Sequence, residues 1–246
     1  MILRAALVLL LALAFAAAPL FSAFNGFDPG LYPIPQSDPP VQPAGWAFAI
    51  WGLIYAWLIA HGAWGLFRRA SDAAWDRMRL PLVASLGVGV PWLAVAERSP
   101  LAATAMIWIM LLAALLALWR TTAATDRWIL LPPVAILAGW LTAASCVSVG
   151  LLLAGWGAMG DVGAAWTALA LAALIAAPMQ LRLGRAPEYG LSVAWALVAV
   201  AARNLGTHGT LTLGAAILAA ILLVFAFAAL SAERMKRRDW TGSSPA

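Results

Sequence analysis

Eight long runs of apolar residues constrain the fold of this chain more than any other feature. Each run is close to the roughly 20 residues that a helix needs to cross the hydrocarbon core of a bilayer. The runs cover residues 5–24, 46–67, 80–96, 101–119, 129–154, 164–181, 187–202 and 210–230. They lack the alternation of polar and apolar residues that is typical of outer-membrane barrel strands. We therefore predict an all-α integral membrane protein with eight transmembrane helices.

The placement of basic residues tests this number of helices independently. If the N-terminus is cytoplasmic, all of the 15 basic residues except Arg98 and Arg203 fall in cytoplasmic segments. This is the asymmetry that the positive-inside rule describes. We therefore expect both termini in the cytoplasm, a bacterial-type inner (plasma) membrane as the location, and the lipid bilayer as a partner. The arginines are scattered among short loops, so no nucleic-acid interface is expected.

Two of the eight runs need a further argument. The run 187–202 is short, but without it the basic tail ERMKRR would lie on the opposite side from every other basic loop. The first run follows Arg4 and contains small residues near Ala16, a pattern that also fits a cleavable signal peptide. Cleavage would leave seven helices and an unchanged topology for the rest of the chain.

The longest connection, residues 25–44, is rich in proline and contains no Lys or Arg. Its prolines, Asp28 and Asp38 exclude a regular helix, and its lack of basic residues places it outside. A loop of about 20 residues without regular structure is usually functional or disordered. A lid over a cavity and a solvated connector both fit this composition.

The segment after this loop, GWAFAIWGLIYAWLIAHGAWGLF (45–67), holds four of the chain's 14 tryptophans. On a helix, Phe48, Trp51 and Tyr55 share one face, and a second aromatic face includes His61. Trp46 is expected in the aromatic belt at the membrane boundary. The deeper rings either pack against other helices or line a pocket for a flat apolar ligand. His61 is either a haem ligand or proton relay, or a polar contact near the cytoplasmic boundary.

Three segments resemble the tryptophan-rich sensory protein family, also called TspO/MBR or translocator proteins. PAGWAFAIWGLIY (43–55) is similar to the second-helix motif W-x-P-P-x-W-x-F-x-x-x-W-x-x-L-Y, with one residue fewer between Phe48 and Trp51. VPWLAVAERSP (90–100) is similar to the third-helix segment N-x-x-W-x-x-L-F-F. LLPPVAILAGWLTAASCVS (130–148) is similar to the fifth-helix segment P-Y-L-A-W-x-x-F-A-x-x-L-N. The aromatic residues at motif positions are Trp46, Phe48, Trp51, Tyr55, Trp92 and Trp140.

The sequence also departs from the family pattern. Ser37 and Asp38 precede the double proline in place of the family's tryptophan, Ala143 stands where the family has phenylalanine, and Ser148 stands where it has asparagine. The family has five helices, which correspond to residues 1–154. Residues 155–246 add three helices and a basic cytoplasmic tail. The chain therefore resembles a divergent and extended member of this family.

The resemblance implies a five-helix bundle with a pocket that opens toward the loop between its first two helices. Family members bind porphyrins and other tetrapyrroles, so the six aromatic residues at motif positions are the expected ligand-binding residues. A porphyrin or haem is then a ligand and not a required cofactor. We predict a membrane binding or sensory protein for a small hydrophobic ligand, as a monomer or a homodimer. A transporter of a small hydrophobic metabolite is the alternative, because several runs contain prolines and GWAFAIWGLIY loosely resembles LSVAWALVAVAARN.

No apolar run carries the residues of a recognisable active site. The sequence has no HExxH, no paired carboxylates within a run and no glycine-rich phosphate loop after a strand. The single cysteine, Cys146, lies within an apolar run and cannot form an internal disulfide, so it is expected to be a packing residue. We therefore expect neither an enzyme nor a metal site.

Overall fold

The described part of the chain, residues 1–22, 28–121 and 126–242, forms eight α-helices and no strand in the computed structural model. Side chains are described as far as Ala228 and at Ser231, so those of the basic tail lie outside this part. The helices are α1 (Ile2–Ala17), α2 (Ile50–Phe67), α3 (Ala73–Ala96), α4 (Pro100–Arg120), α5 (Arg127–Gly155), α6 (Asp161–Arg182), α7 (Pro187–Arg203) and α8 (Gly209–Gly242), with the 3-10 helices η1 (Ala18–Leu20), η2 (Pro29–Leu31) and η3 (Gly45–Ala49). Seven helical segments are long and apolar enough to cross a membrane, and α7, with 17 residues, is the exception. The prediction of a helical multi-pass membrane protein is confirmed.

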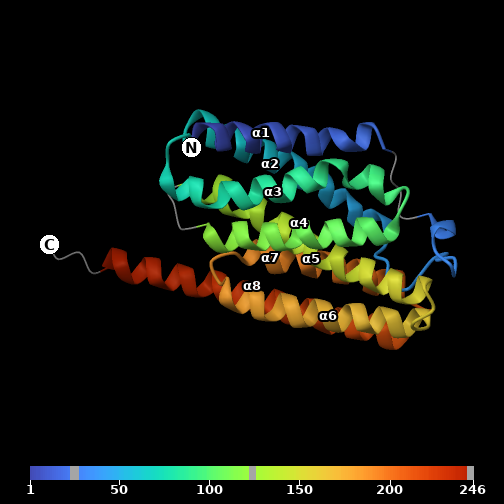
Figure 1. Cartoon of the computed structure of the whole chain (residues 1–246). Coiled ribbons are helices and arrows are strands. Elements are labelled where there is room, and N and C mark those ends of the chain that lie inside the picture. Colours follow the sequence, from blue (N-terminus) through green and yellow to red (C-terminus); the bar gives the residue numbers. More distant parts are fainter. Residues whose placement is uncertain (23–27, 122–125, 243–246) are drawn as a thin grey trace.

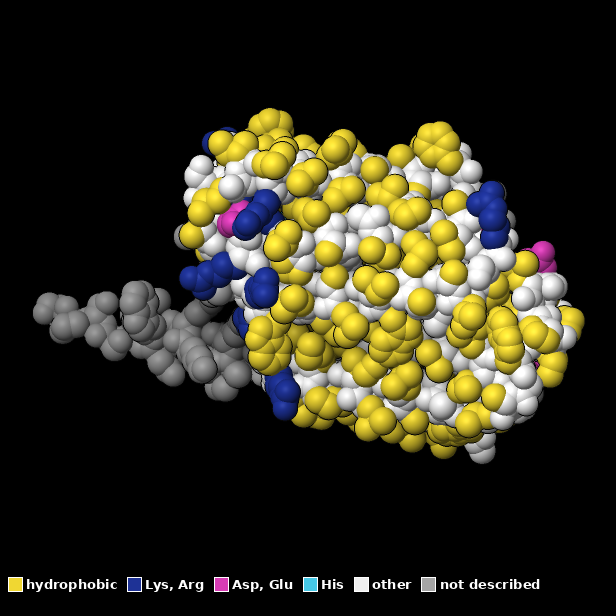
Figure 2. Space-filling view, in the orientation of Figure 1, with side chains coloured by type: hydrophobic (Ala, Val, Ile, Leu, Met, Phe, Trp, Pro, Cys, Tyr) yellow, Lys and Arg dark blue, Asp and Glu magenta, His cyan; other side chains and the backbone are white. Residues whose placement is uncertain are grey.

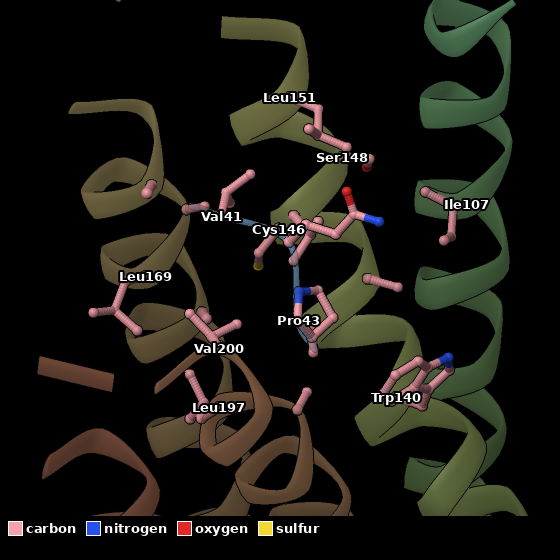
Figure 3. A pocket seen from close by; sticks show the side chains of 18 of the residues that line it. Val41, Pro43, Ile107, Trp140, Cys146, Ser148, Leu151, Leu169, Leu197 and Val200 are labelled. Carbon is pink, nitrogen blue, oxygen red and sulfur yellow. The ribbon is translucent and has the colours of Figure 1, made fainter. Parts of the chain in front are cut away.

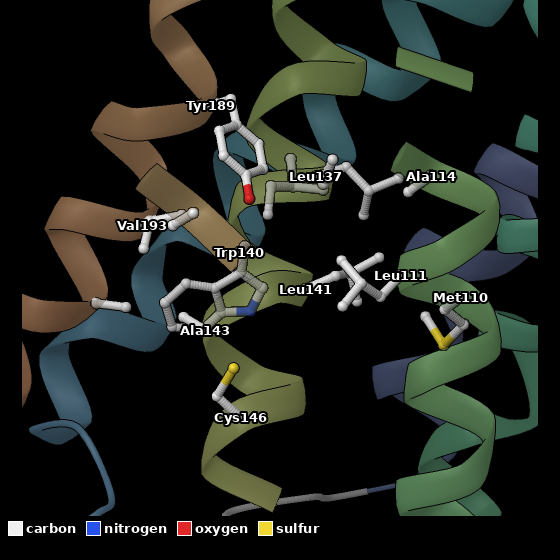
Figure 4. Packing of buried hydrophobic residues seen from close by; sticks show 14 of the residues in the cluster. Met110, Leu111, Ala114, Leu137, Trp140, Leu141, Ala143, Cys146, Tyr189 and Val193 are labelled. Atoms are coloured by element: carbon white, nitrogen blue, oxygen red, sulfur yellow. The ribbon is translucent and has the colours of Figure 1, made fainter. Parts of the chain in front are cut away.

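The helices run side by side, with α1 and α2 along one edge of the bundle and α6 and α8 along the opposite edge (Figure 1). Helix α5 lies in the middle, contacts α2, α4, α6 and α7, and is the most buried of the seven spans. Its residues Trp140 and Leu141 pack between Leu111 of α4 and Val193 of α7 (Figure 4). The face shown in Figure 2 is largely apolar along the helices, and its basic side chains gather near the bundle ends, as a bilayer requires.

Helix α1 is an integral part of this bundle. Its buried face includes Val8, Ala12 and Phe15 and packs against α2 and α3. A Cβ atom added at Gly62 of α2 would lie only 2.8 Å from the Cα atom of Leu9. A glycine at this position therefore permits the close approach of α1 and α2, as small residues commonly do between membrane helices.

Helix α7, the weakest of the predicted spans, buries most of its residues between α5 and α8. A side chain at Gly139 of α5 would collide with the carbonyl oxygen of Tyr189, so glycine allows the two helices to meet. The hydroxyl groups of Tyr189 and Thr142 lie 3.0 Å apart. Gln180 accepts a 2.7 Å hydrogen bond from the backbone N–H of Gly190, in the first turn of α7, where helical N–H groups lack a helical partner.

Two arginines cap the ends of other helices at the end of the bundle where α1 begins. Arg79, which is 1% exposed, donates to the carbonyl oxygens of Gly65, Arg69 and Ala70, where α2 ends. Arg185 donates in the same way to the last carbonyls of α4, those of Leu118, Trp119 and Thr121. The C-terminus of a helix carries unpaired carbonyls and a partial negative charge. A guanidinium group donates hydrogen bonds to these carbonyls and its positive charge compensates the negative one.

The N-terminal boundary predicted for the third span, residue 80, is two turns too late. Helix α3 begins at Ala73 because the carboxylate of Asp72 accepts hydrogen bonds from the N–H groups of Ala74 and Trp75. The same end of the bundle is further tied by Arg69, whose Nε donates to Asp126 at 2.5 Å. This hydrogen bond lowers the pKa of the Asp126 carboxyl group.

The double proline of α5 explains the second aromatic face of α2. Proline has no N–H group, so Pro132 and Pro133 leave the carbonyls of Trp128 and Ile129 without their partners four residues on. Trp57 Nε1 donates to the first of these carbonyls at 3.0 Å. His61 Nδ1 lies 2.8 Å from the second and, because a carbonyl only accepts, it carries the proton. His61 is thus a buried structural donor, one helical turn after Trp57.

The predicted helix 46–67 does not begin as an α-helix. Residues 45–49 form η3, which places Trp46 and Phe48 on a 3-10 helix. Two contacts from α7 hold this turn: the N–H of Ala44 donates to the carbonyl of Ala199, and Trp195 Nε1 donates to the carbonyl of Ala47. These tertiary hydrogen bonds account for the difference from a regular helix.

The pairing between α2 and α5 gives a direct prediction. We expect His61→Leu to lower the free energy of unfolding by about 1 kcal/mol, because the Ile129 carbonyl then lacks a donor. In a Pro133→Ala background the new N–H can bond this carbonyl within the helix, and His61→Leu should cost almost nothing. Titration of micelles with a denaturing detergent measures both values.

A matched background sharpens this test. Pro132→Ala supplies an N–H to the Trp128 carbonyl instead, so it should rescue Trp57→Phe and leave the cost of His61→Leu unchanged. The same cost for His61→Leu in the wild-type and Pro133→Ala proteins would contradict the assignment.

Candidate ligand-binding site

A cavity of about 100 Å³ lies beside α5, where small side chains of α6 and α7 face it (Figure 3). On α6, Ala165, Ala168 and Ala172 repeat at helical spacing and form one wall. Most of the remaining lining is apolar, and the polar groups are Gln42 and Ser148. The other lining residues are Val41, Pro43, Phe48, Trp92, Ile107, Trp140, Ala143, Ala144, Cys146, Val147, Leu151, Leu169, Ala196, Leu197 and Val200.

The proline-rich loop closes one side of this cavity. Its described part begins at residue 28, because residues 23–27 lie outside the described structure, and its residues 41–43 belong to the cavity wall. The loop is tied to α5 by a hydrogen bond from the N–H of Ile34 to the carbonyl of Gly155. It is tied beyond the end of α7 by the side chain of Asn204, which donates to the carbonyl of Pro40 at 2.8 Å. The segment is therefore packed on the bundle and is not a solvated connector.

Three of the six predicted ligand-binding residues line the cavity: Phe48, Trp92 and Trp140. Trp140 of α5 is buried, and the ring of Phe48 meets it edge-on at a centroid distance of 5.7 Å. Trp92 of α3 is held by a hydrogen bond from its Nε1 to the carbonyl of Ala103 at 2.9 Å. Three rings from η3, α3 and α5 thus converge on one apolar space.

The model of the TSPO-like protein family matches residues 4–228, which run from α1 into α8. The chain belongs to this family. Neither the comparison with curated proteins nor the comparison with solved structures gives a match. Membership of the TSPO-like family indicates a membrane sensory, binding or transport protein. The division of the chain at residue 154 stays a prediction, although the family match continues beyond it.

The other three predicted residues of this TSPO-like protein are not in the cavity wall. Trp51 and Tyr55 stack on each other with centroids 5.4 Å apart, and Phe15 of α1 meets both rings edge-on. The ring of Trp51 also meets the ring of Trp140 of α5 edge-on, with centroids 6.1 Å apart. Trp51 and Tyr55 therefore pack between α1 and α5 and do not line the cavity, which is the packing alternative stated above.

Trp46 is the second residue of η3 and lies at the surface of the bundle. Its ring meets that of Trp195 edge-on at 4.9 Å and is 47% exposed. The two segments that loosely resemble each other in sequence, around Trp46 and Trp195, are therefore in direct contact. Trp46 lies at the start of the span Gly45–Phe67, where a half-exposed tryptophan is typical of the membrane boundary.

Two departures from the family pattern fall in the cavity wall. Ala143 and Ser148, in place of phenylalanine and asparagine, both line it, and so does Cys146. Ser148 Oγ donates to the carbonyl of Ser145 in its own helix, which leaves the wall largely apolar. A methyl group at position 143 occupies less of the cavity than a ring would.

The sequence interpretation missed the contribution of α6 and α7. The resemblance drew attention to residues 1–154, whereas Ala168 and Leu197 form the opposite wall. The alanines at 165, 168 and 172 were the available signal, because small residues at helical spacing permit a close approach or a cavity. Among the described side chains, no group of three or more His, Cys, Asp or Glu residues could hold a metal ion.

The placement of Trp51 and Tyr55 predicts the effect of replacing both with leucine. The loss of stacked and edge-on ring contacts should lower the free energy of unfolding by about 2 kcal/mol. Affinity for a ligand in the cavity should change by less than about threefold, because neither ring forms its wall. Thermal unfolding and a porphyrin titration on the same preparation measure the two effects. A tenfold loss of affinity at unchanged stability would place the ligand against these rings instead.

Proposed function

We propose that this TSPO-like protein binds a flat apolar ligand, such as a porphyrin or another tetrapyrrole, in the cavity between α5, α6 and α7. The convergence of Phe48, Trp92 and Trp140 on an apolar space supports this function most strongly. Aromatic walls suit a flat apolar molecule, since ring stacking adds to the burial of its surface. The closing loop supports it further, because a lid can shield such a ligand from water.

The cavity is too small for a tetrapyrrole as it stands, so binding requires part of its wall to move. A volume of about 100 Å³ is below the roughly 150 Å³ of a cavity that admits benzene, and a tetrapyrrole is much larger. The loop 28–44 is attached near the cavity by the contacts Ala44–Ala199, Asn204–Pro40 and Asp38–Arg203. We propose that these contacts open and the loop lifts as a lid. The ligand must bind the open form more tightly than the closed form to stabilise it.

We also propose an orientation in the membrane. Most described arginines lie at the end of the bundle where α1 begins, and Arg98 and Arg203 lie at the other end. The positive-inside rule then places the lid on the outer side of a bacterial-type inner membrane. A reporter fused after residue 158 should read as external, and one fused after residue 184 as cytoplasmic. The reverse pattern would contradict this orientation.

A cavity-filling substitution tests the site itself. Ala143→Phe places a ring in the cavity of this chain and should reduce the affinity for protoporphyrin by at least about tenfold through loss of space. Saturable quenching of tryptophan fluorescence measures the affinity. Ala168→Leu fills the same cavity from α6 and should act in the same direction.

The matched control is Ala170→Phe, the same change on the exposed face of α6. It should leave binding unchanged, and thermal unfolding should show that all three variants remain folded. Unchanged affinity in Ala143→Phe and Ala168→Leu would contradict the cavity as the ligand site. Uptake of the porphyrin into proteoliposomes, lost in the same two variants, would identify a carrier that uses this cavity.

A further inference from the structure

A second concave surface lies at the opposite end of the bundle from the lid. It is a groove of about 600 Å³ among α1, α3 and α4. Three arginines line it, one from each helix: Arg4, Arg77 and Arg120. The only acidic residue among its lining residues is Asp76. Basic and acidic side chains gathered at this end are visible in Figure 2.

The charges in the groove are only partly neutralised by the protein. Asp76 accepts from Arg4 at 2.7 Å and also lies 3.5 Å from Arg79, so its carboxylate is already shared by two guanidinium groups. Arg79 is buried and its other donors cap α2. The side chains of Arg77 and Arg120 are exposed and have no hydrogen bond or ion pair with any described residue. The groove therefore presents two free guanidinium groups beside a third, paired one.

The other residues of the groove are apolar and lie beside the hydrocarbon-facing surface. Leu80 is 56% exposed and Trp119 is 52% exposed. Leu112 and Leu116 continue the exposed apolar surface along α4 toward the middle of the span. A cationic rim above an exposed indole and an apolar helix face is complementary to an amphiphile with an anionic head.

We propose that this groove binds an anionic phospholipid, with its phosphate at Arg77 and Arg120 and its acyl chains along α3 and α4. Guanidinium groups form strong, charge-assisted hydrogen bonds to phosphate oxygens. The pairing of Asp76 with Arg4 and Arg79 keeps its negative charge from dominating the groove. The apolar continuation distinguishes a lipid from free phosphate, which would gain nothing from Leu80 or Trp119.

The test is a lipid titration of the detergent-solubilised full chain, followed by its unfolding temperature. Dioleoyl phosphatidylglycerol should raise the unfolding temperature saturably, and dioleoyl phosphatidylcholine at the same concentration should raise it much less. Arg77→Gln/Arg120→Gln should weaken the apparent affinity for phosphatidylglycerol by about 30-fold. The exposed positions of both residues make an effect on folding small, and the unfolding temperature without lipid checks this.

A charge-matched control separates a site from general surface charge. Arg68→Gln/Arg182→Gln removes two exposed arginines from the same end of the bundle, outside the groove, and should leave the affinity within about twofold. Equal weakening in both double variants would overturn the proposal in favour of diffuse electrostatics. The same stabilisation by inorganic phosphate, or by phosphatidylcholine, would overturn the assignment to an anionic lipid.

Discussion

Every backbone polar group within a bilayer must find its partner inside the protein, and the architecture around α5 follows from this requirement. Pro132 and Pro133 remove two N–H groups from the middle helix and expose two carbonyls. Helix α2 supplies the missing donors, Trp57 and His61, which are spaced by one helical turn. The two hydrogen bonds fix the position of α2 along α5. The 3-10 helix η3, which precedes α2, then meets α5 about two turns after the double proline, where the ring of Phe48 contacts that of Trp140.

The same requirement shapes the two ends of the bundle differently. At the end where α1 begins, the buried Arg79 and the half-buried Arg185 satisfy the last carbonyls of α2 and α4, and Arg68, Arg77, Arg120 and Arg182 stay exposed. At the other end, the proline-rich loop satisfies part of its backbone on α5 and α7. One end therefore carries exposed positive charge, and the other is covered by a segment held through a few separable contacts. A charged headgroup suits the first, and entry of an apolar ligand suits the second.

The sequence was sufficient for the number and type of helices and for three residues of the candidate site. Long apolar runs report membrane spans directly, and the motif positions gave Phe48, Trp92 and Trp140. Periodicity showed that Trp51 and Tyr55 share a face with Phe48, but it could not show that α1, through Phe15, would cover that face. The walls from α6 and α7 consist of alanine, leucine and valine, whose types do not distinguish a cavity from a helix contact. The pairing of His61 with Ile129 depends on which helices are neighbours, although a double proline and two donors four residues apart were both visible.

We propose that the ligand lies among Phe48, Trp92 and Trp140 beneath the loop. The most direct measurement is an experimental structure of the protein with zinc protoporphyrin, in which anomalous scattering locates the zinc ion independently of the protein coordinates. We expect a single zinc position within the cavity between α5, α6 and α7, with residues 41–43 displaced from their contacts. A zinc position on the lipid-facing surface or beside Trp51 and Tyr55, with the cavity and the loop unchanged, would contradict it.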